Sequence, residues 1–157
     1  MKGVLKVRLF CHRNMLYKTL NFFRKIYWFM IRPKTTGVKC IIQNQNDEYL
    51  LIKTTYSGNY WTVPGGGCNK NELLENTAIR EIEEEVGIEV LELKQLGSYV
   101  STLEYKKDTI YLYFAKTYQK NIIKNNREIS EAKWFTKDVL PKNRSKSLDI
   151  ILSKLSG

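Results

Sequence analysis

Hydrophobic and polar positions follow two different periods along the chain, and the period changes after Pro33. In residues 13–31, apolar side chains recur at spacings of four, three, four and three, which is one stripe of an α-helix. The stripe consists of Leu16, Leu20, Phe23, Tyr27 and Met30. Pro33 ends this helix, because the residue before a proline is forced out of the helical region. The pattern predicts a helical arm over residues 1–34 and one domain over residues 35–157.

Beyond the arm, short β-rich runs alternate with turns and with two helical segments. The expected strands cover residues 37–42, 49–56, 59–63, 90–99, 109–118 and 132–135. A helix is expected over residues 72–86, with Asn69 or Asn71 as its N-cap and Gly87 closing it. A C-terminal helix is marked by Leu148, Ile151 and Leu155. This order predicts an α/β (α+β) fold, in which helices pack on a mixed β-sheet.

Length and composition agree with this outline. The chain has 157 residues, of which 43% are hydrophobic and 12% aromatic, enough for one domain with a core and too much for a disordered segment. A transmembrane helix needs about 18 consecutive apolar residues, and the sequence contains no such run. We therefore expect no membrane-spanning segment.

The net charge of +10 is concentrated at one end of the chain. Residues 1–34 hold nine of the 26 basic residues and no acid, which leaves 17 basic and 16 acidic residues in the rest. This makes residues 1–34 a basic amphipathic arm on a nearly neutral domain. Three interpretations stay open: a helix packed on the domain, a helix lying on a membrane surface, and a targeting segment. A contact with nucleic acid is also conceivable, but aromatic residues between the cations fit a membrane surface better.

The cysteines and the histidine limit the kinds of metal site and catalytic site that the sequence allows. Three cysteines without a CxxC spacing, Cys11, Cys40 and Cys68, indicate neither a zinc site nor a disulfide framework. A reducing compartment such as the cytoplasm is the default. The single histidine, His12, lies in the arm, so triad catalysis in the domain is improbable. Carboxylates with a metal ion are the natural alternative.

Three glutamates of the helix at 72–86 are the first candidates. Glu81, Glu84 and Glu85 fall within an arc of about 100° on a helix, so their carboxylates share one face. Like charges at these spacings destabilise a helix by roughly 0.2–0.5 kcal/mol per pair. A hard cation such as Mg²⁺ or Mn²⁺ would compensate, because such ions prefer oxygen ligands. An ordinary solvated acidic face is the alternative, but the glycine run at 65–67 before the helix favours a site for phosphates.

The spacing of these residues resembles a known motif. Gly66 is followed after five residues by Glu72 and, after seven more, by the run from Arg80 to Ile88. This spacing matches every fixed position of the Nudix box, GX5EX7REUXEEXGU, with U an aliphatic residue. The usual lead-in of the box is also present, from Trp61 to Gly66. The chain is therefore identified as similar to the Nudix hydrolases, which implies a mixed sheet sandwiched between helices.

The resemblance also implies roles for individual residues. Glu81, Glu84 and Glu85 correspond to the metal-binding and catalytic carboxylates, and the carbonyl of Gly65 often joins the metal shell in similar proteins. The expected cofactor is Mg²⁺ or Mn²⁺. The residues implied to support the box are Gly66, Glu72, Arg80 and Gly87. Glu72 and Arg80 look like the pair that braces the loop against the helix.

A further acid outside the box often takes part in catalysis in this family. The segment from Arg127 to Phe135 resembles the region that supplies it, with Glu128 as the first choice and Glu131 as the second. A solvated position for both acids is the alternative.

The resemblance implies hydrolysis of a diphosphate linkage in a nucleotide-type substrate, by attack of water at phosphorus. Residues considered for substrate contacts are Lys53, Tyr56, Tyr60 and Tyr105. Leu103 replaces the proline that ADP-ribose hydrolases often carry after the box, which argues against that substrate. Two alternatives stay open: hydrolysis at the 5′ end of RNA, and a non-catalytic binding module tethered to a membrane or to RNA by the arm.

Overall fold

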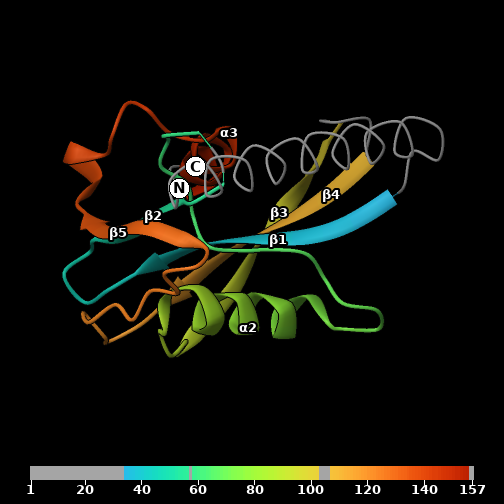
Figure 1. Cartoon of the computed structure of the whole chain (residues 1–157), viewed down its shortest axis with the longest axis horizontal. Coiled ribbons are helices and arrows are strands. Elements are labelled where there is room, and N and C mark those ends of the chain that lie inside the picture. Colours follow the sequence, from blue (N-terminus) through green and yellow to red (C-terminus); the bar gives the residue numbers. More distant parts are fainter. Residues whose placement is uncertain (1–33, 57, 103–106, 156–157) are drawn as a thin grey trace, which may run out of the picture. The chain divides into compact units, whose positions relative to one another are not determined.

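The computed structural model describes residues 34–56, 58–102 and 107–155 (Figure 1). Five strands and two α-helices make up this part of the chain. The strands are β1 (Lys34–Gln43), β2 (Tyr49–Thr54), β3 (Glu92–Ser101), β4 (Lys107–Lys116) and β5 (Ile129–Phe135). The helices are α2 (Leu74–Val86) and α3 (Lys146–Leu155), with a short 3₁₀ helix, η2 (Lys137–Val139), between β5 and α3.

The five strands form one mixed sheet in the order β3-β4-β1-β2-β5. β2 runs antiparallel to β1 and to β5. The N–H group of Thr117 donates to the carbonyl of Gln43 across 3.0 Å, which joins the C-terminal ends of β4 and β1. Those two strands therefore run parallel, and the expectation of a mixed sheet is confirmed.

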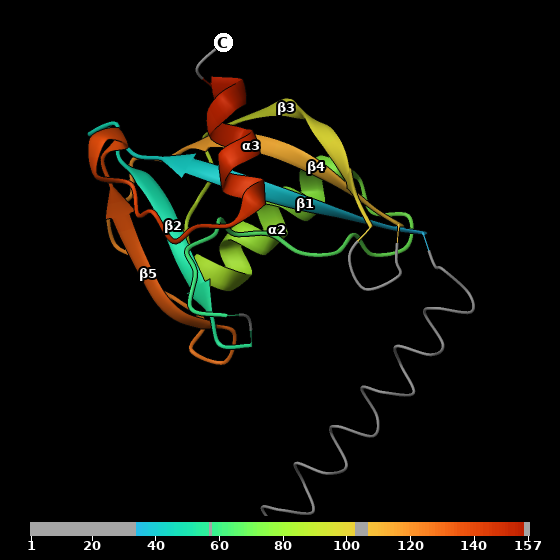
Figure 2. The same cartoon turned by 90° about the horizontal axis from the view of Figure 1, so that it is seen from above.

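The two helices cover opposite faces of this sheet, as Figures 1 and 2 show. Alternation along the strands separates the core into two clusters. On β1, Cys40 and Ile42 face the cluster that contains Ile82 of α2, whereas Ile41 between them faces the cluster that contains Leu148 of α3. All five side chains are fully buried. Both helices are thus held in place by apolar packing, and the sandwich implied by the resemblance is confirmed.

Residues 61–67 link β2 to the loop before α2, and the expected strand at 59–63 is wrong. Trp61 and Thr62 make only isolated bridges, to Arg144 and Ile52. Beyond them the chain pairs with β1, where the N–H group of Cys40 donates to the carbonyl of Pro64 at 2.9 Å. Pro64, which has no N–H group, contributes only its carbonyl to this pairing.

Other boundaries differ in detail. The remaining five expected strands are present, with ends shifted by at most three residues. Neither Asn69 nor Asn71 caps α2, since the N-cap is Leu73 and no side chain bonds there. Gly87 closes α2 as expected, in the left-handed region at φ 63°.

Contacts along the chain divide it into two compact units. One consists of residues 36–100 and 109–157. The other consists of residues 1–35 and 101–108, of which the structure describes only six strand-end residues. The predicted helical arm at 1–34 lies outside the described residues, apart from Lys34. Among the helices that are described, none is long and apolar enough to cross a membrane.

Candidate active site

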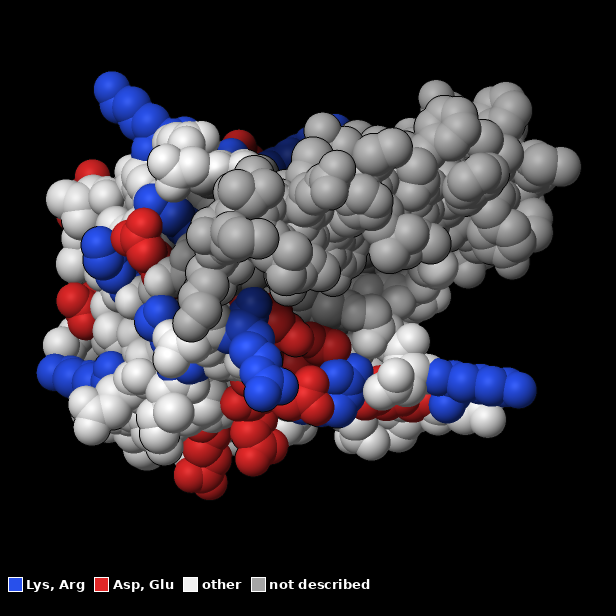
Figure 3. Space-filling view, in the orientation of Figure 1, with Lys and Arg blue, Asp and Glu red and all other residues white. Residues whose placement is uncertain are grey.

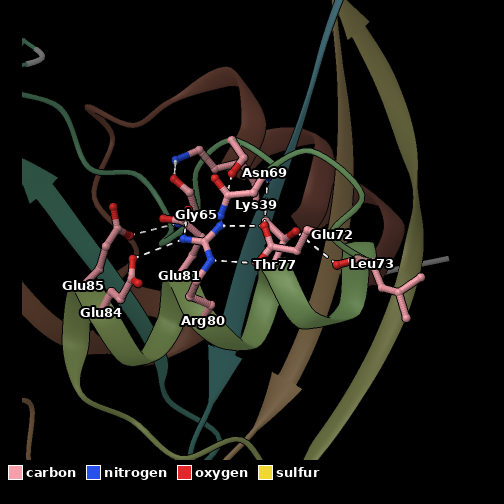
Figure 4. Close-up of polar contacts among 11 residues, drawn as sticks. Lys39, Gly65, Asn69, Glu72, Leu73, Thr77, Arg80, Glu81, Glu84 and Glu85 are labelled. Carbon is pink, nitrogen blue, oxygen red and sulfur yellow. Dashed lines mark hydrogen bonds and ion pairs between the residues drawn. The ribbon is translucent and has the colours of Figure 1, made fainter.

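One face of α2 presents three carboxylates to the loop at residues 64–67 (Figure 4). Glu81, Glu84 and Glu85 lie on this face, as helical spacing predicts. They differ in exposure: Glu85 is only 3% exposed, whereas the side chain of Glu84 is 58% exposed. The neighbouring face of the helix packs in the core through Ala78 and Ile82, both 0% exposed. The carboxylates are therefore held on a rigid base.

Two glycines allow the loop to approach these carboxylates. The N–H group of Gly65 donates to Oε2 of Glu85 across 2.9 Å. Gly65 has φ +140°, and a Cβ atom there would collide with the carbonyl of Val38. A Cβ atom on Gly66 would lie 2.5 Å from Oε2 of Glu81. Both positions thus require glycine for close packing between the loop and the acidic face.

Arg80 connects the loop, the start of α2 and the carboxylate face. Its guanidinium bonds Glu72 through two nitrogens, at 2.8 and 3.0 Å, and reaches the carbonyl of Gly67 at 3.2 Å. It also donates to Glu81 at 2.7 Å and to Glu84 at 3.1 Å. Hydrogen bonds from Arg80 lower the pKa of Glu72 to about 2. The pair that the resemblance implies is therefore formed, and the same arginine also holds two of the candidate metal ligands.

A turn at residues 125–128 brings a fourth acid to the site. The N–H group of Asn125 donates to the carbonyl of Glu85 at 2.9 Å, which ties the turn to the end of α2. The N–H group of Thr55 donates to the carbonyl of Glu128 at 2.8 Å, which ties it to the end of β2. The charge of Glu128 contributes to raising the pKa of Glu85, after burial as the largest cause. Glu131 instead forms ion pairs with Lys53 at 2.9 Å and with Lys133 at 3.1 Å.

Burial is the main electrostatic feature of the site. It raises the pKa of Glu85 to about 7, opposed by Lys39 and by the Gly65 hydrogen bond and assisted by the charges of Glu81 and Glu128. Acidic side chains gather over α2 on the face drawn in Figure 3, with basic side chains among them. The negative charge at Glu85 is thus incompletely compensated by the protein itself.

The residues considered for substrate contacts lie in different settings. Lys53 is engaged with Glu131, and its Nζ atom lies 4.7 Å from the centre of the Trp61 ring. Tyr56 is 75% exposed and follows Thr55, whose N–H group donates to the carbonyl of Glu128. Tyr60 is half-buried. Tyr105 lies outside the described residues.

The donor chemistry fits a hard divalent cation. Three carboxylates and the carbonyl of Gly65 are oxygen ligands of the type that Mg²⁺ and Mn²⁺ prefer. A cation would also supply the positive charge that the buried Glu85 lacks. Within the described residues, no three such side chains already converge on one point. Arg80 forms ion pairs with Glu81 and Glu84, so a metal ion would have to replace the guanidinium as the partner of these two carboxylates.

Sequence reasoning missed one residue of the site. Lys39 of β1 donates to the carbonyls of Val63 and Gly65 at 3.2 and 3.0 Å. Its only sequence signal is a lysine inside an apolar strand, between Val38 and Cys40.

Comparison with known proteins agrees with this architecture. The family model for the NUDIX domain matches residues 33–154. A crystal structure of a MutT NUDIX hydrolase from Burkholderia pseudomallei superposes with a TM-score of 0.70 at 23% identity, covering 78% of this chain and 98% of that one. At this identity the likeness shows a shared fold.

Two curated relatives are similar in sequence. An NAD-capped RNA hydrolase, NudC, from Pseudomonas aeruginosa is 29% identical over 133 residues, which cover 80% of this chain and 47% of that protein. The human diphosphoinositol polyphosphate phosphohydrolase NUDT4B is 32% identical over 80 residues, or 51% of this chain and 44% of that protein. The chain thus spans about half the length of the curated relatives it matches.

Proposed function

The chain belongs to the Nudix family, and from this premise we propose that it is a divalent-metal-dependent hydrolase of a diphosphate linkage. The substrate is a nucleoside diphosphate derivative or a nucleoside triphosphate, and water attacks phosphorus. The observation that carries the proposal is the buried carboxylate of Glu85, which accepts the N–H group of Gly65 and shares one face of α2 with Glu81 and Glu84. This arrangement supports a site for a cation and an anionic substrate together.

Four groups of the chain are suited to hold the cation: the carboxylates of Glu81, Glu84 and Glu85, and the carbonyl of Gly65. When bound, Mg²⁺ or Mn²⁺ neutralises charge on the diphosphate and lowers the pKa of a water molecule. The chain orients these ligands through the apolar packing of α2 and through the hydrogen bond from Gly65 to Glu85.

Glu128 is the residue we assign to positioning and deprotonating the attacking water. Its turn is tied to the backbone of Glu85 by Asn125, and its own backbone is held at the end of β2 by Thr55. In the part of the chain that the structure describes, Glu128 has no ion-pair partner, whereas Glu131 has two. A carboxylate without a cationic partner is free to accept a proton from water. The reaction needs no covalent intermediate on the protein.

Tyr56 supports a substrate that carries a nucleobase. Its ring is exposed, and it follows Thr55, which bonds the turn that carries Glu128, so a base could stack on it there. Stacking of a base on an aromatic ring is worth about 1–3 kcal/mol. We therefore assign Tyr56 to the base of the nucleotide.

A second candidate substrate is the capped 5′ end of RNA. The relative named as an NAD-capped RNA hydrolase aligns with 80% of this chain. A dinucleotide cap presents the same chemistry as a free dinucleotide, namely a diphosphate with a base on each side. A non-catalytic binding module is the less favoured alternative, because every carboxylate of the box is present.

A substrate panel tests these candidates. The full-length chain is incubated with Mg²⁺ or Mn²⁺ and with nucleoside triphosphates, NAD, ADP-ribose, dinucleoside polyphosphates, NAD-capped RNA and a diphosphoinositol polyphosphate. We expect release of a nucleoside monophosphate from a small nucleotide. Cleavage of capped RNA in strong preference to free NAD would support the second candidate. Cleavage of the inositol compound alone would contradict a nucleotide substrate, and no cleavage with metal bound would favour the binding module.

A further inference from the structure

The ammonium group of a lysine lies at the carboxylate site, and within the described residues it forms no direct ion pair. Lys39 is half-buried, and its Nζ atom donates to the carbonyls of Val63 and Gly65 at 3.2 and 3.0 Å (Figure 4). An ammonium group has three N–H donors. Among the residues that the structure describes, the third donor has no acceptor.

The backbone on both sides of Lys39 is paired with the loop. The N–H group of Val38 donates to the carbonyl of Gly66, and that of Cys40 donates to the carbonyl of Pro64, both at 2.9 Å. The strand and the loop therefore form one unit. The backbone of Lys39 thus lies beside the loop, where the side chain reaches the carbonyls of Val63 and Gly65.

The charges around Lys39 are those of the candidate metal ligands. Burial lowers the pKa of Lys39, and the negative charges of Glu85 and Glu81 oppose that effect. In return, Lys39 opposes the rise in the pKa of Glu85. Arg80, the other cation of the site, is already committed to Glu72, Glu81 and Glu84. Within the described residues, Lys39 is thus the cation of the site that has an N–H group without an acceptor.

We propose that the Lys39 ammonium is a fixed charge of the active site, which binds a phosphoryl oxygen of the substrate through its third N–H group and opposes the divalent cation. The inference rests on the proposed function and adds a substrate-binding residue to it. One positive charge attracts an anion and repels a cation, so its removal should change the two affinities in opposite directions. A residue that merely clamps the loop would change both affinities in the same direction, or neither.

The test uses two variants, Lys39→Met and Lys39→Arg. Methionine keeps an unbranched side chain of similar length and removes the charge, whereas arginine retains the charge. Calorimetry measures the affinity for Mn²⁺ alone and, at saturating Mg²⁺, the affinity for methylenediphosphonate, a diphosphate analogue that is not hydrolysed. Lys137→Met, in the exposed helix η2, controls for the loss of one positive charge elsewhere. A thermal melt of each variant checks that it is folded.

We expect Lys39→Met to bind Mn²⁺ about three- to tenfold more tightly and methylenediphosphonate about tenfold more weakly than the wild type. Lys39→Arg should restore most of both affinities. Weaker binding of both probes by a folded Lys39→Met variant, or no change in either, would overturn the proposal. If the wild type binds both probes but hydrolyses no substrate, the proposed hydrolase activity is contradicted. The comparison of the Lys39 variants then still tests the role of Lys39.

Discussion

The N–H group of Gly65 donates to the carboxylate of Glu85 across 2.9 Å, and this bond joins the glycine loop to the most buried acid of α2. The two residues are 20 positions apart in the sequence. Burial dominates the environment of Glu85, so the bond does not prevent the rise of its pKa to about 7. The site is therefore arranged for a carboxylate that gains its charge together with a cation.

The raised pKa of Glu85 predicts how stability depends on pH without metal. An unfolded glutamate has a pKa of about 4.3, so between about pH 4.3 and 7 the folded chain holds a proton that the unfolded chain has lost. The free energy of unfolding should fall by up to about 4 kcal/mol across that window. The Glu85→Gln variant should lack this fall in the free energy of unfolding. Denaturant titrations from pH 4 to 8 in EDTA measure the free energy of unfolding of both proteins. An equal dependence on pH in the two proteins would contradict the raised pKa. Addition of Mg²⁺ should weaken this dependence in the wild type.

Gly66→Ala should disable the site while leaving the fold intact. The new Cβ atom would lie 2.5 Å from the carboxylate of Glu81, and that flexible side-chain end moves more easily than the backbone. We expect roughly tenfold weaker Mn²⁺ binding, with little change in the melting temperature. Gly67→Ala is the matched control, because a Cβ atom there meets nothing within 4 Å. Similar Mn²⁺ affinities for the two variants would contradict the close contact of Gly66 with Glu81.

The brace between Glu72 and Arg80 should appear in acid unfolding. Hydrogen bonds from Arg80 lower the pKa of Glu72 to about 2, so its stabilisation is complete above about pH 5 and is lost as the pH falls towards 2. Glu72→Gln should lower the melting temperature at pH 7, and the difference from the wild type should vanish near pH 2. Glu83→Gln, an exposed acid of the same helix, should melt like the wild type at both pH values. A pH-independent effect of Glu72→Gln would rule out the ion pair as its cause.

Glu128 and Glu131 should differ in their contribution to turnover. Loss of a general base typically slows a reaction by about 10² or more, so Glu128→Gln should lower kcat at least about a hundredfold. Glu131→Gln removes the partner of Lys53 and Lys133, and we expect kcat within about fivefold of the wild type. Steady-state kinetics on the best substrate of the panel separates the two. The reverse order would transfer the role of base to Glu131.

The sequence was sufficient to predict the parts of the site that are close together in the chain. The spacing from Gly66 to Ile88 placed the carboxylates on one helix face, and the structure has them there. The alternation of apolar residues predicted the strands to within a few residues, because side-chain burial in a sheet follows a period of two.

The features that sequence reasoning missed depend on pairing between distant segments. Lys39 reaches the site only because β1 bonds the loop at residues 64–67, a pairing that no local pattern reports. Lys53 was a candidate for phosphate contacts, but the register of β2 and β5 sets it opposite Glu131. The asparagine N-cap was wrong for a local reason: α2 begins after Leu73, and Asn71 has φ 64°, in the left-handed region instead of the extended region of an N-cap.

The central claim is that the carboxylate face of α2 performs metal-dependent hydrolysis. The most direct test compares Glu84→Gln with Glu83→Gln, its exposed neighbour on the same helix, which lies outside the fixed positions of the box. Both variants are assayed with Mg²⁺ and Mn²⁺ for release of nucleoside monophosphate from the best substrate. We predict that Glu84→Gln loses at least about 99% of the wild-type rate, whereas Glu83→Gln stays within about twofold of it. Undiminished turnover by a folded Glu84→Gln variant would contradict the account.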